Sequence, residues 1–143
     1  MINYQKAVLK DINEITELLT KFEGDRKDIS ANQFMLAKEN NKLIGCIRIK
    51  ELNKGCLELA SLVIMPEYRK QGIGSQLAKT ILSKEKRRPI YLLCSVDQQG
   101  FYERNGFKLM SAEILPEVLK NEYRRIIKLP FVQNVKVIAM AYR

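Results

Sequence analysis

The chain has 143 residues, of which 46% are hydrophobic and 29% charged, with 7 Gly and 4 Pro. This length fits one domain, and the composition is that of an ordinary globular protein rather than a disordered or collagen-like one. Lys and Arg outnumber Asp and Glu by 25 to 16, and the net charge of +9 favours anionic partners such as phosphates, acidic metabolites, nucleic acid or anionic lipid. The absence of His excludes the usual neutral-pH general base, the usual zinc ligand and every Ser/His or Cys/His nucleophile pair.

Three cysteines, Cys46, Cys56 and Cys94, each lie in an apolar, strand-like run and form no C-x-x-C pair. We therefore expect three buried, reduced thiols. The first residues lack the apolar core of a secretory signal, and the longest near-apolar stretch, 59–65, is far shorter than the ~18 residues needed to span a bilayer. These features predict a cytoplasmic protein that makes no membrane contact.

The first half of the chain is predicted to hold one helix and four strands. The predicted elements are a strand at 2–9, a helix that opens with Asp11 and Glu14 as a capping box, a hairpin of 33–38 and 43–50 that turns at Asn40-Asn41, and a strand at 56–65. The last of these strands is apolar on both faces apart from Glu58 and Ser61. That pattern is typical of a central strand that helices cover on both sides.

The second half of the chain alternates helices and strands. The predicted elements are a helix at 72–86, a strand at 90–95, a helix at 98–105 with Asp97 as its cap and Gly106 as its left-handed end, a strand near 107–114, a helix near 117–127 and a strand at 135–142. No repeat, low-complexity tract or linker interrupts this order. The alternation indicates an α/β fold.

The strongest local signal is the segment Arg69-Lys70-Gln71-Gly72-Ile73-Gly74, between a buried strand and an amphipathic helix. Glycines let the backbone approach a ligand closely, while the first-turn N–H groups and the positive end of the helix dipole favour a pyrophosphate. A flexible strand-to-helix turn is the alternative for this loop alone. The loop is not a Rossmann fingerprint, because Leu77 stands in place of the third glycine, and it lacks the Gly-Lys-Ser/Thr of a P-loop.

With its surroundings this segment resembles the GNAT superfamily of acetyl-CoA-dependent N-acetyltransferases. The family signature [Q/R]-x-x-G-x-[G/A] is met by residues 69–74, within the stretch VIMPEYRKQGIGSQL at 63–77. A second family motif, F-Y-x-x-x-G-F after the next strand, is present at 101–107. The two motifs stand in the family's order and spacing, and the likeness extends over nearly the whole chain.

The resemblance implies a single α/β (α+β) domain over residues 1–143, with a mixed, strongly bent β-sheet flanked by helices on both faces. It implies direct transfer of an acetyl group from acetyl-CoA to a primary amine of a small molecule, an amino acid, a peptide N-terminus or a lysine, with no metal. Two alternatives stay open: a CoA-binding regulatory module without transfer activity, and a basic nucleic-acid-binding domain. The sequence does not distinguish a monomer from a homodimer.

The resemblance also implies which residues bind acetyl-CoA. The backbone at 62–64 would pair with the pantetheine arm like an added strand, and the amides around 69–75 would hold the pyrophosphate. The residues concerned are Leu62, Val63, Ile64, Arg69, Lys70, Gln71, Gly72, Ile73, Gly74 and Ser75. Many relatives carry Asn and Ala where this chain has Ser95 and Gln98, so part of the usual contact set differs here.

Tyr102 matches the family tyrosine that lies near the CoA sulfur and protonates the departing thiolate. A phenol, with its pKa near ~10, suits a proton donor at neutral pH. The alternative is an aromatic ring that only packs against the sheet, since Phe101 and Tyr102 are adjacent and one of them suffices to face the core.

Glu58 interrupts an otherwise apolar strand, where a lone charge is costly. It lies fourteen residues before Gly72, which matches the glutamate that some lysine-acetylating members use as general base, and an apolar setting would raise its pKa toward the useful range. A cross-strand ion pair with Arg48 or Lys50 is the main alternative and would lower the pKa of Glu58 instead. A water relay and binding of the substrate ammonium are the others.

The remaining signals concern the partner. The basic runs at 84–88 and 123–125 are expected to be solvated helix surfaces, because no known nucleic-acid module surrounds them. The segments Leu115-Pro116-Glu117-Val118 and Ile138-Ala139-Met140 are similar to single-domain N-acetylglutamate synthases within the superfamily, although the cysteines usual in that tail are replaced by Asn121, Glu122 and Tyr123. Glutamate is therefore one candidate acceptor, and a basic protein suits an acidic substrate.

Overall fold

The computed structural model of the chain describes residues 1–132 and 134–143. The chain forms two compact units, the first made of 1–50 and 59–86 and the second of 51–58 and 87–143. The strands of the mixed sheet are hydrogen-bonded in the order β1-β2-β3-β4-β5-β7-β6. Strand β4 (Leu57–Ile64) pairs in parallel with β5 (Ile90–Ser95), whereas β1 with β2, β2 with β3, β5 with β7 and β6 with β7 are antiparallel.

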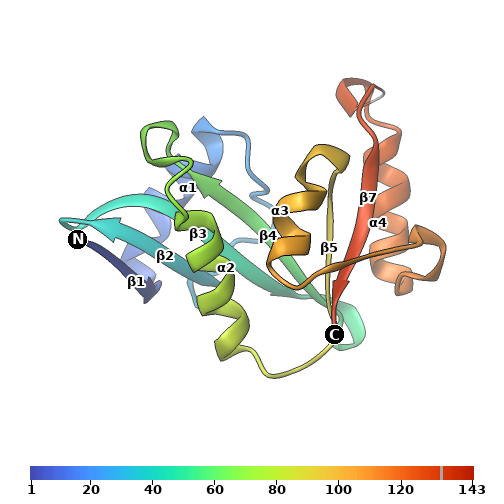
Figure 1. Cartoon of the computed structure of the whole chain (residues 1–143), viewed down its shortest axis with the longest axis horizontal. Helices are drawn as coiled ribbons and strands as arrows, with labels where there is room; N and C mark the ends of the chain where they lie inside the picture. The colour runs from blue at the N-terminus through green and yellow to red at the C-terminus, as the bar shows by residue number, and fades with distance from the viewer. Residues whose placement is uncertain (133) are drawn as a thin grey trace. The chain divides into compact units, whose positions relative to one another are not determined.

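The first unit is a sheet with one helix on each face (Figure 1). Its elements are β1 (Ile2–Lys6), α1 (Ile12–Lys21), β2 (Phe34–Glu39), β3 (Lys42–Glu51, all but its last residue), β4 from residue 59 onward and α2 (Ile73–Lys84). On one face, Phe34 and Leu36 of β2 pack with Ile15 and Leu19 of α1 in a buried cluster. On the other face, a Cβ at Gly45 of β3 would lie 3.2–3.4 Å from the Val63 backbone and the Leu77 side chain of α2, and 2.7 Å from Ile64 Cδ1. Glycine at this position therefore lets α2 lie close against the sheet.

The second unit also has helices on both faces of its strands. Its elements are the turn Asn53–Gly55, the first two residues of β4, β5 (Ile90–Ser95), α3 (Gln99–Arg104), β6 (Lys108–Met110), α4 (Glu117–Ile127) and β7 (Val137–Tyr142). Helix α4 buries Leu119 against Cys56 and Ala139, together with Tyr91 and Leu93 of β5. Because side chains alternate along a strand, Leu92 and Cys94 face the opposite side, where α3 lies.

Most of the predicted elements are confirmed. The hairpin turns at Asn40 and Asn41, whose φ values of 51° and 65° are those of a two-residue turn between twisted strands. The strand at 90–95 and the helix at 117–127 have the predicted bounds, and Gly106 ends α3 with a φ of 95°. The three cysteines are free and buried, as predicted. The fold class, a mixed α/β sheet with helices on both faces, is confirmed within each unit.

Asp11 is the N-cap residue of α1, as predicted, but neither Asp11 nor Asp97 caps its helix with its side chain. The Asp11 carboxylate caps no N–H of α1; it accepts hydrogen bonds from the Val8 N–H at 2.8 Å and from Lys38 Nζ at 2.9 Å. Both Asp11 and Lys38 are buried, so the lysine recruits the carboxylate that would otherwise cap the helix. Helix α3 has Gln98 at its N-cap, and the Asp97 carboxylate accepts a hydrogen bond from the Ser95 hydroxyl instead.

The strand predicted near 107–114 covers only Lys108–Met110. Directly after it, the Ser111 hydroxyl accepts a hydrogen bond from the Glu113 N–H at 3.2 Å and begins a short helical turn at Ala112–Ile114. A serine side chain that bonds its own neighbouring backbone competes with strand pairing, and that competition ends β6 early.

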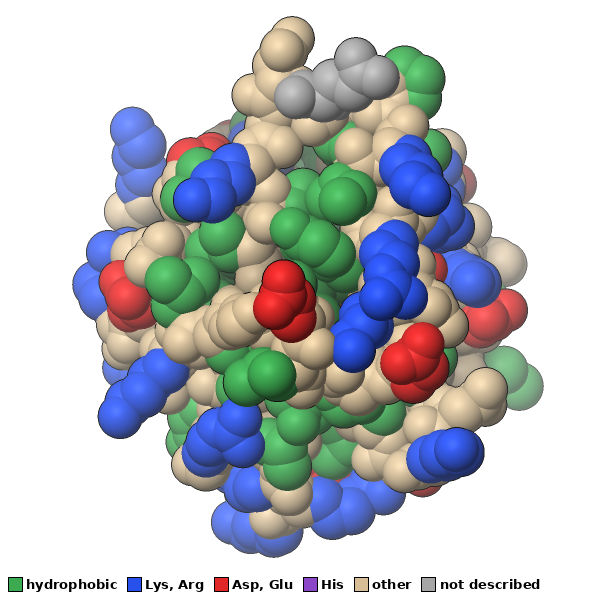
Figure 2. Space-filling view, turned by 90° about the vertical axis from the view of Figure 1, so that its right-hand side faces the viewer, with side chains coloured by type: hydrophobic (Ala, Val, Ile, Leu, Met, Phe, Trp, Pro, Cys, Tyr) green, Lys and Arg blue, Asp and Glu red, His purple; other side chains and the backbone are tan. Residues whose placement is uncertain are grey.

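The described residues contain no helix long and apolar enough to cross a membrane. Within the same part of the chain, no three Cys, Asp or Glu side chains gather closely enough to hold a metal ion. Figure 2 shows Lys and Arg side chains spread around one face, with hydrophobic side chains exposed between them.

Candidate functional site

The turn between β4 and α2 has the backbone geometry of an anion site. Gly72 is the N-cap of α2 with a φ of 82°, and Lys70 is also left-handed with a φ of 63°. The Gln76 N–H donates to the Gly72 carbonyl at 3.0 Å, so the helix begins directly after the glycine. The first N–H groups of an α-helix have no acceptor within the helix, and with the dipole they attract negative charge. A Cβ at Gly72 would meet nothing within 4 Å, so conformation rather than space requires glycine there.

Side chains tie this turn to the strands beneath it. Arg69 Nε donates to the Ile64 carbonyl at 2.9 Å, and its guanidinium lies 5.7 Å from the Phe22 ring centroid. Tyr68 donates its hydroxyl to Glu39 of β2 at 2.8 Å. The chain from 69 to 72 is nonetheless exposed along its whole length. The first unit thus brings together all ten residues predicted to bind acetyl-CoA, from Leu62 at the end of β4 to Ser75 in the first turn of α2.

The end of β4 alternates one buried residue with two half-buried ones. Val63 is buried in the core beneath α1, whereas Leu62 and Ile64 are half-buried. Directly after the strand, the Met65 N–H donates to the Ile44 carbonyl of β3 at 2.8 Å.

A buried polar cluster next to this strand was not foreseen from the sequence. Arg48 of β3 is fully buried, and its Nε donates to the Ser61 hydroxyl at 2.7 Å. Ser61 has a φ of 61° although it lies within β4, and its own hydroxyl donates to the Asp25 carbonyl at 2.7 Å. The only sequence signals for the cluster were polar residues inside two apolar runs.

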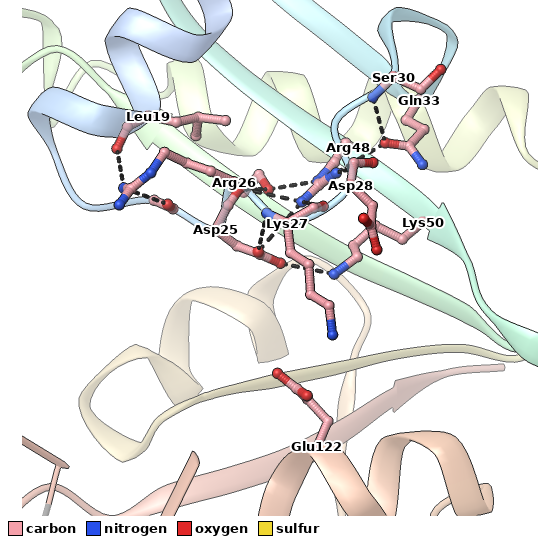
Figure 3. Close-up of polar contacts among 12 residues, drawn as sticks. Leu19, Asp25, Arg26, Lys27, Asp28, Ser30, Gln33, Arg48, Lys50 and Glu122 are labelled. Carbon is pink, nitrogen blue, oxygen red and sulfur yellow. Dashed lines mark hydrogen bonds and ion pairs between the residues drawn. The ribbon is translucent and has the colours of Figure 1, made fainter. Parts of the chain in front are cut away.

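Asp25 is the carboxylate that the first unit places beside Arg48 and Lys50. Its Oδ2 lies 3.0 Å from Lys50 Nζ and its Oδ1 lies 3.4 Å from Arg48 Nη2 (Figure 3). Burial alone would raise the pKa of Asp25, but hydrogen bonds from the Lys27 N–H and from Lys50, with the positive charge of both cations, lower it below its usual value. The sequence had offered these two cations as partners for Glu58 and gave no sign of Asp25.

Glu58 lies in the second unit, at the start of β4. It is 8% exposed and stands opposite Tyr91 of β5 in the parallel register. Its side chain is therefore almost completely withdrawn from water.

Tyr102 lies in α3 and is half-buried among aromatic rings. Its ring meets Phe101 edge-on at 5.0 Å between centroids and Phe107 at 5.9 Å. Burial raises the pKa of Tyr102 well above its usual value of 10, and the neighbouring Cys94 adds to the effect. Burial likewise raises the pKa of the Cys94 thiol to about 11. Both groups are therefore protonated and uncharged at physiological pH.

The rest of the F-Y-x-x-x-G-F motif holds Tyr102 in place. The Phe107 N–H donates to the Tyr102 carbonyl at 3.0 Å, and Asn105 Nδ2 donates to the Phe101 carbonyl at 2.9 Å. A Cβ at Gly106 would lie 2.7 Å from the Tyr142 ring, so glycine is needed both for the positive φ and for the close approach of β7. The motif thus ends the short helix α3 and fixes the position of its tyrosine.

The second unit also contains a cavity of about 490 Å³ that includes none of the predicted site residues. It lies at the amino-terminal ends of β4 and β5, among the 53–57 turn, residues 87–91 and the first turns of α4. The anion-site turn and Tyr102 both follow the carboxyl ends of these strands.

Residues 30–109, more than half of the chain, match the family described as Acetyltransferase (GNAT) domain. The chain is 28% identical over 133 residues to the amino-acid acetyltransferase of Shewanella oneidensis, covering 83% of this chain and 29% of that protein. It is 31% identical over 87 residues to an uncharacterized N-acetyltransferase of Chlorobaculum tepidum, covering 59% of this chain and 55% of the other.

Solved structures show the same fold. The N-acetylglutamate synthase from Neisseria gonorrhoeae, complexed with coenzyme A and N-acetyl-glutamate, superposes with a TM-score of 0.77 at 22% identity, over 100% of this chain and 35% of that one. The chain therefore spans about a third or less of the length of these two larger relatives. On the matched residues and the shared fold, the chain belongs to the GNAT acetyltransferase family.

Proposed function

We propose that this protein transfers the acetyl group of acetyl-CoA directly to a primary amine, and that the acceptor is an amino acid. The observation that carries the proposal is the turn from β4 to α2, where left-handed Gly72 opens a helix N-terminus inside the segment that matches the GNAT family. Such a terminus suits the pyrophosphate of a coenzyme A thioester.

Binding of acetyl-CoA would use backbone more than side chains. The amides from Arg69 to Ser75 hold the pyrophosphate, with Arg69 and Lys70 adding positive charge. The backbone at 62–64 pairs with the pantetheine arm as an added strand would. The exposure of residues 69–72 and the half-buried Leu62 and Ile64 support this assignment.

Transfer then needs a proton acceptor and a proton donor. Glu58 takes a proton from the substrate amine, whose nitrogen forms a bond to the thioester carbon. The carbon–sulfur bond breaks, and Tyr102 gives its proton to the sulfur that leaves. An amide of β4 donates a hydrogen bond to the thioester oxygen as negative charge develops there. The burial of Glu58 and the raised pKa of Tyr102 support these roles.

The acceptor class rests on the named relatives and on charge. The Shewanella relative is an amino-acid acetyltransferase, and the net charge of +9 favours acceptors that carry a carboxylate, glutamate among them. The whole-chain likeness to the Neisseria structure supports the two units acting as one domain. Three free thiols support a reducing compartment such as the cytoplasm.

A thiol-release assay tests the proposal. The protein is incubated with acetyl-CoA and a panel of glutamate, neutral and basic amino acids, simple alkylamines and a lysine-containing peptide, and free CoA is followed. We expect release that depends on an amino acid. Acetyl-CoA binding in calorimetry without release on any amine would indicate a regulatory module, and salt-dependent DNA binding without acetyl-CoA binding would indicate a nucleic-acid-binding domain.

Glu58→Gln tests the general base, because the substitution keeps shape and removes charge. We expect near-normal stability, a loss of about 10²-fold in kcat and loss of the acidic limb of the pH profile. If Glu58 is instead half of a buried ion pair, the free energy of unfolding should fall by several kcal/mol, since the cation loses its partner.

Glu51→Gln is the matched control for Glu58→Gln. Glu51 lies at the exposed end of β3, where it pairs with Arg87 at 2.8 Å, and an exposed pair contributes little to stability. Thermal melts and kcat/KM profiles between about pH 4 and 9 compare the two variants, a range that spans ordinary and raised carboxylate pKa values. Full activity and an unchanged acidic limb in Glu58→Gln would remove Glu58 from the mechanism.

A further inference from the structure

We propose that Arg48 is a positioning residue for acetyl transfer: through Ser61 it fixes the direction of the Leu62 amide in β4, and it holds the loop at 25–28 against the same strand. The inference rests on the proposed function, which uses an amide of this strand at the thioester oxygen. It adds a residue from a different strand and a loop from outside both sequence motifs.

Arg48 uses all three of its guanidinium nitrogens within the first unit (Figure 3). Besides the bond from Nε to Ser61 at 2.7 Å, Nη1 donates to Gln33 Oε1 at 2.9 Å. Nη2 donates to the carbonyls of Lys27 at 2.8 Å and Asp25 at 3.2 Å. The guanidinium also lies 5.4 Å from the Phe34 ring centroid. The planar guanidinium has five N–H donors and can bind all of these acceptors at once, whereas a lysine ammonium group has only three.

Ser61 is held in a conformation that it would not adopt unaided. Its φ of 61° lies in the left-handed region, which is unfavourable for a residue with a Cβ and foreign to a strand. Such residues persist only where the surroundings determine them, and here the Ser61 hydroxyl both accepts from Arg48 and donates to the Asp25 carbonyl. Arg48 and the loop therefore set the backbone of β4 at this residue.

The contacts of the Ser61 carbonyl give the direction of the next amide. Cys46 Sγ donates to that carbonyl at 3.4 Å, so the carbonyl points toward β3. In a trans peptide unit the C=O and N–H groups point in opposite directions, and the peptide between Ser61 and Leu62 is trans. The Leu62 N–H thus points away from Cys46. An irregular residue of this kind re-aims strand backbone beside many active sites.

The same side chain fixes the loop that precedes β2. Carbonyls of Asp25, Lys27 and Asp28 all accept from Arg48, and the Asp25 carboxylate bonds Lys50 at 3.0 Å. One fully buried cation thereby couples a loop, a strand end and the amide at Leu62.

The test compares Arg48→Lys, Ser61→Ala, Ser61→Gly and the double variant Arg48→Lys with Ser61→Gly. Arg48→Lys and Ser61→Ala should each lower kcat by roughly 10- to 100-fold, the scale of a misplaced reacting group, with a smaller change in the KM for acetyl-CoA. Ser61→Gly should keep most of kcat, because glycine adopts a positive φ without support. In the double variant, glycine should recover part of the kcat that Arg48→Lys loses.

A second readout does not depend on turnover. In backbone amide NMR spectra of the whole protein, Arg48→Lys and Ser61→Ala should shift the Leu62 amide and speed hydrogen exchange at 25–28, whereas Arg87→Lys, the same change at an exposed arginine, should do neither. If Arg48→Lys does not fold, the shift of the Leu62 amide is measured in Ser61→Ala alone, a substitution that buries no charge.

The outcomes separate the two proposals. The positioning role is overturned if the Leu62 amide signal does not shift in Ser61→Ala or in a folded Arg48→Lys. It is also overturned if the variants lower the melting temperature but leave kcat unchanged, so that glycine at position 61 has no loss to recover. If the variants shift the Leu62 amide but the wild-type protein acetylates no amine, the proposed function is overturned and the geometric role of Arg48 stays supported.

Discussion

At the scale of single residues, chemistry here is set by neighbours that are distant in sequence. The motif identified Tyr102, but its raised pKa comes from burial and from Cys94 of β5, a contact between a helix and a strand that periodicity does not reveal. Asp25 was missed for the same reason: it lies in a polar loop without motif or pattern, and only the tertiary fold brings it to Lys50. Glu58, in contrast, was visible because one carboxylate inside an apolar strand is conspicuous in sequence.

Tyr102→Phe is expected to lower kcat by about 10²-fold, and more than it raises the KM for acetyl-CoA, because the hydroxyl acts late, on the departing thiolate. The ring keeps its packing against Phe101 and Phe107. Since burial raises the pKa of Tyr102 above 10, the wild-type rate should show no alkaline limb due to this residue up to that pH.

Steady-state kinetics against pH measures both effects of Tyr102→Phe. The matched control is Tyr123→Phe in α4, which removes a hydroxyl from another half-buried tyrosine. A kcat for Tyr102→Phe equal to that of wild type would return Tyr102 to a packing role.

At the scale of elements, local sequence signals predicted a helix, strand or turn correctly where no tertiary contact competed with them. The Asn40-Asn41 hairpin, β5 and α4 follow from turn residues and periodicity alone. The cap predictions failed where the side chain binds another group, because Asp11 accepts a hydrogen bond from the buried Lys38, twenty-seven positions away. The turn before α2 was correctly identified from its glycines, but the anchoring of Arg69 on Ile64 depends on where β4 ends in space.

Gly72→Glu is expected to abolish acetyl-CoA binding while the fold survives. A glutamate at a φ of 82° strains the turn and places a negative charge where the pyrophosphate would bind. Gly55→Glu is the matched control, because Gly55 has a φ of 72° and equally open space around its Cβ position but lies in a different turn.

Calorimetry with acetyl-CoA and thermal melts of both glycine variants give the comparison. The melting temperatures should fall alike, whereas only Gly72→Glu should lose binding. A folded Gly72→Glu that binds acetyl-CoA like wild type would show that the anion site lies elsewhere.

At the scale of the whole molecule, the sequence predicted the fold class and both motif regions, yet it did not reveal the clamp that Arg48 makes between β4 and the loop at 25–28. The reason is physical: Arg48 donates to backbone carbonyl groups of 25–28. Every residue has such a carbonyl, so the sequence does not indicate which ones bind Arg48. The burial of all three thiols was predictable, because each stands in an apolar strand run.

The three thiols are expected to resist a disulfide reagent such as Ellman's in the native protein and to react fully after unfolding. Burial raises the pKa of Cys46 to about 12 and that of Cys94 to about 11, so almost no thiolate is present near pH 8. Cys56 lines the 490 Å³ cavity and should be the first to react as denaturant is added.

Labelling followed by absorbance and mass spectrometry checks this prediction. The matched variant Cys56→Ser should remove the first phase. Rapid uptake of one equivalent by the native protein would contradict the burial. If the native protein does not react with the reagent, the same reagent can also measure released CoA without background from the protein's thiols.

The place of β7 between β5 and β6 has a consequence for synthesis on the ribosome. The first unit contains nothing beyond residue 86, so it can form its contacts while later residues are still being made. The second unit pairs β5 and β6 only through residues 137–142. Until those residues emerge from the exit tunnel, both strands expose unsatisfied edges, and chaperone binding during translation should fall on this half of the chain.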